Sequence, residues 1–384
     1  MKIAFLSDGI APYITGGMQQ HSASLAKNLV IKGHKVDLFH FVSNDSEIPS
    51  KKELNTLFFN DKYSYNNVYC TKFPTSIYFP GHYLWNSYRY SSWIYSILKL
   101  NYEEYDFIYA KGFTPWKLIA KRKKNNWTSP PIGVKFHGYE MYQFAPDFRL
   151  KLKHWMLRPF VKWINVNSDF VFSYGSKISK LVQELGVRHD RILNVPSGVE
   201  DNMILKSINP SGDKRRFLFI GRNERRKGLI ELHNTIKKLD LIFDKAEFHF
   251  IGPISDNDKI SHNNLNIFYH GLIKDVKSKN EIIDNCDILI CPSFSEGMPN
   301  VILESMARGL AIIASNVGAI PLMVNSENGI IINEINVQSI LKSIIDLYSM
   351  SNTEIDHLKN KSLLKVKSFS WNKVINIMEN KINN

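Results

Sequence analysis

Short runs of β-branched and aromatic residues recur along the chain, and segments with helical spacing separate them. In the first half these runs lie at residues 2–7, 35–42, 107–112, 131–138 and 169–175. In the second half they lie at residues 216–222, 246–252, 266–271, 287–293 and 310–315. Alternation of strand and helix is typical of a parallel sheet covered by helices. The pattern therefore predicts that each half of the chain forms its own α/β, doubly wound unit.

The chain is long enough for two domains. At 384 residues it exceeds the usual size of a single hydrophobic core. Residues 194–216 carry the prolines, glycines and serines of a linker. We expect a first domain over 1–198, a second over 199–366 and a closing helix over 367–384. Two such sheets that face each other would form a cleft at the carboxyl ends of their strands, where open α/β sheets bind ligands.

The closing segment predicts a helix with one apolar face. Its large apolar side chains recur at helical spacing, at Phe369, Trp371, Val374, Ile375 and Met378. A one-sided helix has to pack on another part of the molecule. We expect this helix to pack back toward the first domain.

Composition narrows the class of protein. Hydrophobic residues make up 44% of the chain and aromatic residues 12%, which favours filled cores over disorder. Every apolar run is interrupted well short of the roughly 20 residues that cross a bilayer. The formal net charge of +13 attracts phosphates, anionic lipids or nucleic acid. Because no helix-turn-helix pattern, basic tail or zinc-finger spacing occurs, we expect no nucleic-acid partner.

The cysteines indicate a reducing compartment. Cys70, Cys286 and Cys291 have neither a paired framework nor the spacing of metal ligands. We interpret all of them as core thiols. The apolar run at the amino terminus meets Asp8 almost at once, which disfavours a secretory signal. We therefore expect a cytoplasmic protein.

The first candidate site in the second half is "SFSEGMPNVILESMARG", residues 293–309. It follows a predicted buried strand and opens a helix, and Gly297 with Pro299 permits a tight turn whose amides can bind phosphate. Glu296 lies in the loop and Glu304 on the helix, with seven residues between them. A carboxylate accepts paired hydrogen bonds from vicinal hydroxyls, so each glutamate can bind the hydroxyl groups of a sugar. Two glutamates at this spacing also arise by chance.

A second candidate is the basic turn "FIGRNERRKGL", residues 219–229. Arg222 follows a predicted strand, and Lys227 opens the next helix. Together they can hold a diphosphate and neutralise charge that develops on it as a leaving group. The alternative interpretation is a solvated basic loop, because Arg225 and Arg226 lie there too.

The first half offers weaker candidates. Gly16 and Gly17 lie between the first strand and a helix, where glycine lets a ligand approach the backbone. Neither half contains G-x-G-x-x-G, which disfavours a dinucleotide dehydrogenase. His137 ends the strand of "KFHGYE" and can donate a hydrogen bond or transfer a proton. A lone histidine is more often structural.

These loops, in this order, resemble the retaining glycosyltransferases of family 4, which have the GT-B fold and an E-x7-E motif. The resemblance runs through "GGMQQHSASLAKNLVIKGHKV", "KFHGYE", "NVPSGVE", "FIGRNERRKGL", "YHGLIKDV", "CDILICPSFSEGMPNVILESMARG" and "SFSW". It implies two facing Rossmann-like domains with a cleft between them and a carboxyl-terminal crossover helix. The first domain would hold the acceptor and the second a nucleotide diphosphate sugar.

The resemblance also assigns roles. Arg222 and Lys227 would clasp the diphosphate, Glu304 would bind the ribose and Glu296 the transferred hexose. His137 would touch that sugar from the first domain. The implied catalytic set is Glu296, His137, Arg222 and Lys227, and the implied donor-binding set is Gly16, Gly17, Arg222, Lys227, Glu296, Gly297, Met298, Pro299, Asn300 and Glu304.

The implied reaction transfers a hexose or N-acetylhexosamine with retention and without a protein nucleophile. We expect no metal requirement and no cofactor, with a UDP- or GDP-linked sugar as co-substrate. The acceptor would be a polyprenyl-linked saccharide of a bacterial capsule, O-antigen (lipopolysaccharide) or exopolysaccharide. Alternatives remain a phosphorylase or nucleotide-sugar epimerase of the same fold, or a noncatalytic protein that binds sugar nucleotides or nucleic acid.

Two segments suggest a membrane surface. Residues 148–164 carry five Lys/Arg and no acid, with Leu152, Met156, Phe160 and Trp163 as a helical stripe that Pro159 should kink. Residues 78–100 are unusually aromatic. Such segments either rest on anionic lipid or form core helices with a solvated face. The first alternative would place the protein peripherally on the inner face of the cell membrane.

Overall fold

The computed structural model describes residues 1–75, 78–125, 129–239 and 243–383. The chain divides into two compact units. The first contains Met1–Tyr142, Asp147–Ser197 and Trp371–Asn384, and the second contains Gln143–Pro146 and Gly198–Ser370. Each unit is a parallel sheet with helices on both faces, as the hydrophobic pattern predicts.

The sheet of the first unit has seven strands in the order β3-β2-β1-β4-β5-β6-β7. The strands are β1 Lys2–Leu6, β2 Lys35–Val42, β3 Asn67–Lys72, β4 Phe107–Lys111, β5 Ile132–Lys135, β6 Phe170–Ser173 and β7 Ile192–Asn194. The helices are α1 Gly17–Ile31, α2 Lys51–Phe59, α3 His82–Leu98, α4 Trp116–Asn125, α5 Phe148–Asn167, α6 Lys177–Glu184 and α13 Trp371–Asn383.

Both faces of this sheet are covered. Helices α1, α2 and α13 pack on one face, where Ile3 and Phe5 of β1 join the apolar side of α13. Helices α3, α4, α5 and α6 pack on the other face, which receives Ala4 and Leu6. Successive residues of β1 therefore point to opposite layers, as the pleat requires. Trp371 is almost fully buried and anchors α13 in the first layer.

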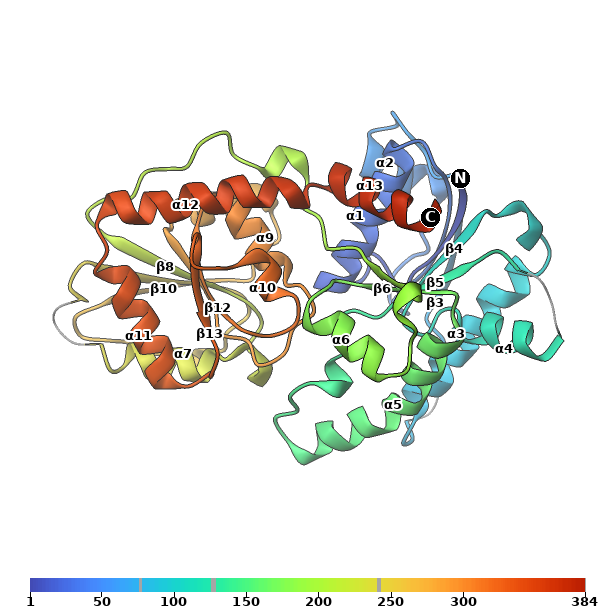
Figure 1. Cartoon of the computed structure of the whole chain (residues 1–384), viewed down its shortest axis with the longest axis horizontal. Coiled ribbons are helices and arrows are strands. Elements are labelled where there is room, and N and C mark those ends of the chain that lie inside the picture. Colours follow the sequence, from blue (N-terminus) through green and yellow to red (C-terminus); the bar gives the residue numbers. More distant parts are fainter. Residues whose placement is uncertain (76–77, 126–128, 240–242, 384) are drawn as a thin grey trace. The chain divides into compact units, whose positions relative to one another are not determined.

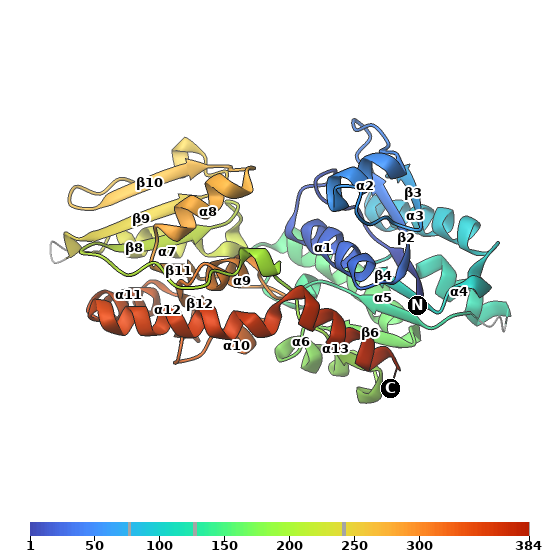
Figure 2. The same cartoon turned by 90° about the horizontal axis from the view of Figure 1, so that it is seen from above.

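The sheet of the second unit has six strands in the order β10-β9-β8-β11-β12-β13. The strands are β8 Arg215–Ile220, β9 Ala246–Ile251, β10 Asn266–Gly271, β11 Ile288–Cys291, β12 Ala311–Ser315 and β13 Gly329–Ile332. The helices are α7 Leu229–Ile236, α8 Val276–Asp284, α9 Asn300–Ala307, α10 Ile320–Met323, α11 Val337–Tyr348 and α12 Asn352–Val366. Figure 1 shows α7 and α11 on one side of this sheet, and α9 and α12 on the other. Figure 2 shows β10, β9 and β8 of this sheet side by side.

Helix α5 corrects one detail of the sequence analysis. It runs unbroken through Pro159, and its buried face is His154, Val161, Ile164 and Asn165. The expected stripe of Leu152, Met156, Phe160 and Trp163 is divided between surface and core, since Leu152 and Phe160 are exposed whereas Trp163 packs against the core. The helix rotates its most apolar positions partly outward. In the part of the chain that the structure describes, no helix has the length and apolarity needed to span a bilayer.

Candidate active site

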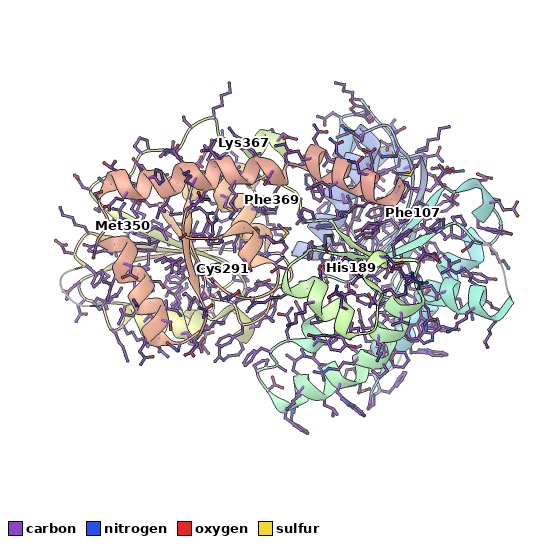
Figure 3. The ribbon with its side chains drawn as sticks, in the orientation of Figure 1. Phe107, His189, Cys291, Met350, Lys367 and Phe369 are labelled. Atoms are coloured by element: carbon purple, nitrogen blue, oxygen red, sulfur yellow. The ribbon has the colours of Figure 1, made fainter. Side chains whose placement is uncertain are left out.

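The loop that carries Glu296 follows the central strand β11 in the second unit. Cys291 ends that strand, and Figure 3 labels it within the second unit. The loop ends at Pro299, which precedes the first residue of α9. Its shape depends on a neighbouring glycine: Gly318 has φ of 55°, and a Cβ there would lie 2.3 Å from the Glu296 carbonyl oxygen. Only a residue without a side chain fits this close backbone approach.

The basic turn packs directly against this loop. Residues Arg225–Lys227 form a 3-10 turn that ends at Gly228, where φ is 71°. A Cβ on Gly228 would lie 2.1 Å from the carbonyl oxygen of Pro292. The amide of Phe294 donates a 2.7 Å hydrogen bond to the carbonyl of Arg226. The two predicted candidate loops are thus held together backbone to backbone.

This packing brings Lys227 to Glu296. The Lys227 Nζ lies 2.6 Å from Glu296 Oε1, and Arg226 lies 3.7 Å from the other carboxylate oxygen. Glu296 is only 7% exposed, so these cations take the place of the water that its carboxylate has lost. The side-chain amide of Gln143 adds a bond to the Glu296 carbonyl (2.9 Å) and accepts one from its N–H (3.3 Å). The carboxylate is therefore fixed before any ligand binds.

Arg222 has a different environment. Its Nε pairs with Glu224 at 3.0 Å, and the same carboxylate holds Arg226 at 2.8 Å. The Arg222 side chain is 62% exposed. Because the guanidinium of Arg222 is exposed, it can turn toward an incoming phosphate at little cost. The ammonium of Lys227, in contrast, is already paired with Glu296.

Glu304 lies on α9 and has a partner on the preceding helix. Lys279 of α8 places its Nζ 2.9 Å from Glu304 Oε2. Both side chains are about one-fifth exposed, at 21% and 19%. Sequence reasoning missed Lys279, because only the fold brings α8 beside α9. The pair fixes the orientation of the carboxylate that the sequence assigns to a ribose.

The predicted residues of the first half lie in the first unit. Gly17 begins α1 and Gly16 precedes it in extended backbone, with φ of 161°. A Cβ on Gly16 would lie 2.4 Å from Gln19 Oε1, whereas one on Gly17 would meet nothing within 4 Å. The atom near Gly16 is the end of the flexible Gln19 side chain, which can turn away, so local packing requires glycine at neither position. The remaining predicted residues, at 222, 227, 296–300 and 304, lie in the second unit.

His137 belongs to a buried polar group that the sequence did not reveal. Its Nδ1 lies 2.6 Å from the hydroxyl of Tyr174, and the Lys135 ammonium lies 3.9 Å from the centre of the Tyr174 ring. Burial, with the charges of Lys111 and Lys135, holds the pKa of His137 well below its usual range. The pKa of Lys111 itself falls to about 7 because it is buried. The imidazole of His137 is therefore neutral near pH 7.

A cavity of about 370 Å³ adjoins this group at the carboxyl ends of β1, β4 and β5. Aromatic side chains from α3 and from the loops that follow these strands form much of the cavity wall. Asp8, Lys135 and His137 contribute polar groups to it. Within the described ranges, Asp8 Oδ1 and His137 Nε2 have no hydrogen-bond partner. Unpaired buried polar atoms are uncommon and call for an explanation, such as a ligand. Burial also raises the pKa of Asp8, against the opposing charge of Lys111.

The described segments contain neither a candidate metal site nor a disulfide. Among their residues, no group of three or more His, Cys, Asp or Glu side chains could hold a metal ion. Cys286 and Cys291 are buried and Cys70 is half-buried, and none of the three is in a disulfide. Burial raises the pKa of Cys70 to about 12 and that of Cys291 to about 11, so both thiols stay protonated.

Two doubly wound parallel sheets, with a basic turn packed on a glutamate loop in the second, define a glycosyltransferase of the GT-B fold. The family model "Glycosyltransferase Family 4" matches residues 15–202, and "Glycosyl transferases group 1" matches residues 214–350. Together these models match most of the chain. The chain belongs to the family 4 glycosyltransferases, a retaining class.

Relatives match over the whole chain or parts of it. An uncharacterised glycosyltransferase of Methanocaldococcus jannaschii is 25% identical over 403 residues, which cover 98% of this chain and 96% of the relative. The N,N'-diacetylbacillosaminyl-diphospho-undecaprenol α-1,3-N-acetylgalactosaminyltransferase of Campylobacter jejuni is 24% identical over 57% of this chain and 59% of its own. A capsular polysaccharide biosynthesis glycosyltransferase of Staphylococcus aureus is 27% identical over 33% of this chain and 34% of its own.

Solved structures share the fold at low identity. Sucrose-phosphate synthase from Thermosynechococcus elongatus has a TM-score of 0.76 at 15% identity, with coverage of 99% of this chain and 97% of that one. The Anabaena protein HepE, crystallised with UDP and glucose, has a TM-score of 0.69 at 15% identity, with coverage of 100% and 99%.

Proposed function

We propose that the enzyme transfers a hexose or N-acetylhexosamine from a UDP- or GDP-linked sugar to a polyprenyl-linked saccharide. The product would belong to a bacterial surface polysaccharide. The observation that carries this proposal is the contact of Lys227 with Glu296 beside the start of α9. Support for the lipid-linked acceptor comes from the name of the Campylobacter relative, and support for a surface polysaccharide from that of the Staphylococcus relative.

The second unit would hold the donor. Lys227 and Arg222 would bind the pyrophosphate, with the backbone amides of Gly297, Met298 and Asn300 at the positive end of the α9 dipole. Glu296 would accept bonds from hydroxyls of the transferred sugar, and Glu304 from the ribose. When the glycosidic bond to the phosphate breaks, negative charge grows on the leaving diphosphate, and the two cations would stabilise it in place of a metal ion.

The acceptor hydroxyl would attack the face from which the diphosphate departs. Its proton would pass to the departing phosphate oxygen, so the protein supplies no nucleophile. One bond to the anomeric carbon breaks and one forms, and the configuration is retained. We assign no general base to the chain, because the leaving group can serve as one.

The cavity of the first unit would hold the acceptor sugar. Aromatic rings pack well against the apolar faces of sugar rings. Neutral His137 can donate a hydrogen bond from Nε2, because Tyr174 engages Nδ1. Asp8 can accept one. We predict that Asp8→Asn raises the KM for the acceptor about tenfold, as expected when a neutral amide oxygen replaces a charged hydrogen-bond acceptor, and leaves UDP binding unchanged.

Asp45→Asn is the matched control for that variant, since Asp45 is an exposed carboxylate of the same unit. Acceptor KM and UDP affinity would be measured on both variants. Loss of UDP binding in Asp8→Asn, with an unchanged acceptor KM, would contradict the assignment of this cavity.

Single turnover tests the function as a whole. Radiolabelled UDP- and GDP-sugars would be incubated with the enzyme and lipid extracts that contain polyprenyl-linked saccharides, with EDTA present. The proposal predicts label in the lipid fraction and an anomeric configuration equal to that of the donor. Product formation only with inorganic phosphate would instead indicate a phosphorylase, and a changed sugar still on its nucleotide would indicate an epimerase.

A further inference from the structure

The first unit exposes an unusual number of large apolar side chains at one place. On α5, Phe148 is 78% exposed, Leu152 49% and Trp155 65%. Their spacing of four and three residues places them on one side of the helix. This side lies away from the buried face of His154, Val161 and Ile164. Helix α5 thus has two apolar sides, and only one of them packs in the core.

A second group of exposed aromatics lies beside this helix. Tyr78 is 78% exposed, Phe79 42% and Trp85 52%, just before and within the start of α3. The start of α3 lies against the middle of α5, since a Cβ on Gly81 would be 3.8 Å from Met156 Cε. We call the six exposed side chains of Phe148, Leu152, Trp155, Tyr78, Phe79 and Trp85, five of which are aromatic, the aromatic face. Large apolar side chains that are exposed close together on a surface indicate an interaction site.

The charges around the aromatic face select its partner. Residues 148–164 carry Arg149, Lys151, Lys153, Arg158 and Lys162, and no acidic residue. A protein interface of ordinary composition is depleted of lysine. Exposed Trp, Tyr and Phe flanked by lysines are instead typical of a helix that lies in the headgroup region of an anionic bilayer.

The aromatic face also borders the cavity of the first unit. Tyr83, in the first turn of α3, is 49% exposed and lines the cavity, and Leu157 of α5 lines it too. A saccharide in the cavity could therefore remain attached to a lipid in a bilayer beneath the aromatic face.

We propose that the aromatic face binds an anionic lipid surface and so presents the cavity to lipid-linked acceptors. The lipid-binding part stands on the exposed side chains and charges alone. The presentation of an acceptor rests on the proposed function. Apolar side chains would enter the headgroup region, and the lysines and arginines would pair with lipid phosphates.

Vesicle flotation of the full chain tests the lipid-binding part. Vesicles of phosphatidylcholine with phosphatidylglycerol are compared with vesicles of phosphatidylcholine alone, at low and high salt. We expect the enzyme to float with the anionic vesicles and to be released by salt, because screening weakens the attraction. Absence from the anionic vesicles at low salt overturns the proposal.

Two leucines provide a matched pair for locating the surface. Leu152 on α5 is 49% exposed and Leu57 on α2 is 50% exposed, both in the first unit. We expect Leu152→Ser to lower the vesicle partition coefficient roughly tenfold, the equivalent of part of the transfer free energy of a leucine. Leu57→Ser should leave it unchanged. Equal partition of the two variants would place the lipid contact elsewhere and overturn the proposal.

A charge pair adds an independent check. Lys151→Glu should weaken binding to anionic vesicles, and Lys52→Glu, at an exposed position of α2, should not. Both variants should bind UDP like the parent enzyme. If the enzyme binds vesicles through α5 but transfers no sugar, the proposed function fails and the lipid surface stands. If the enzyme transfers sugar to a water-soluble acceptor but does not bind vesicles, the lipid-binding proposal fails and the transferase activity stands.

Discussion

The ammonium group of Lys227 lies 2.6 Å from a carboxylate oxygen of Glu296, which is nearly buried. The contact joins the basic turn after β8 to the loop before α9. A pyrophosphate that binds here has to share Lys227 with Glu296, so the ion pair of the free enzyme competes with the donor. In the free enzyme the same ion pair holds the Glu296 carboxylate in place for a sugar hydroxyl.

That competition predicts opposite effects of two substitutions. Lys227→Ala removes the cation, so it should weaken UDP binding at least tenfold and slow transfer by about 10² or more. Glu296→Gln removes the competing charge, so UDP should bind as tightly as before or more tightly, while transfer falls. Isothermal titration with UDP and GDP and single-turnover rates would measure both. Equal loss of nucleotide affinity in the two variants would mean that Glu296 does not compete for Lys227.

Glu304 should report on the ribose. If its carboxylate accepts hydrogen bonds from the ribose hydroxyls, the parent enzyme should prefer UDP over 2′-deoxy-UDP by about 10- to 100-fold, the range for a hydrogen bond to a charged group. Glu304→Ala should bind the two nucleotides almost equally. Lys279→Ala, which removes only the partner at 2.9 Å, should keep a reduced preference. If Glu304→Ala still prefers UDP over 2′-deoxy-UDP, another group binds the ribose hydroxyls.

The backbone approach at Gly318 should be intolerant of any side chain. Gly318→Ala would place a Cβ 2.3 Å from the Glu296 carbonyl oxygen at a φ of 55°. We expect a loss of unfolding free energy of about 1–3 kcal/mol, together with loss of transfer, because the Glu296 loop must shift. Gly212→Ala is the control, since a Cβ there meets nothing within 4 Å. Thermal unfolding of the two variants should differ by several degrees, and matching melting curves would contradict the steric account.

Stability should fall on mild acidification. His40 on β2 is fully buried, and burial lowers its pKa to about 4. The unfolded chain has an ordinary histidine pKa near 6.5, so it takes up a proton that the folded chain refuses. Stability is therefore fully present above about pH 6.5 and decreases toward pH 4, by up to about 3 kcal/mol for this residue. Denaturant unfolding of the parent and of His40→Asn, between about pH 7 and about pH 5, should show a smaller slope in the variant. A stability that rises on acidification would contradict this sign.

The hydrophobic pattern predicted much of the architecture. All ten predicted strands are present, because each is a run with strong β propensity, and nine of them also contain buried residues, whereas β10 has none. The strands it missed, β3, β7 and β13, lie at sheet edges. Edge strands are short and partly exposed, so β3 has no residue in the core and β7 has only three residues. Their pairing depends on a neighbouring strand that the local sequence does not encode.

The site was predicted unevenly. Motif spacing found Lys227 and Glu296, which the fold joins through the close approaches at Gly228 and Gly318. Motif spacing missed Lys279, Gln143 and Asp8. Each of them lies far in the sequence from the site residues beside which the fold places it. Nothing in the local sequence around "FLSDGI" marks Asp8 as the lining of a cavity.

A crystal structure of the full enzyme with UDP or GDP would test the central claim most directly. The account predicts a pyrophosphate within hydrogen-bond distance of Lys227 Nζ, with Arg222 turned toward it and the ribose hydroxyls on the Glu304 carboxylate. A pyrophosphate bound away from both the basic turn and the start of α9 would contradict it.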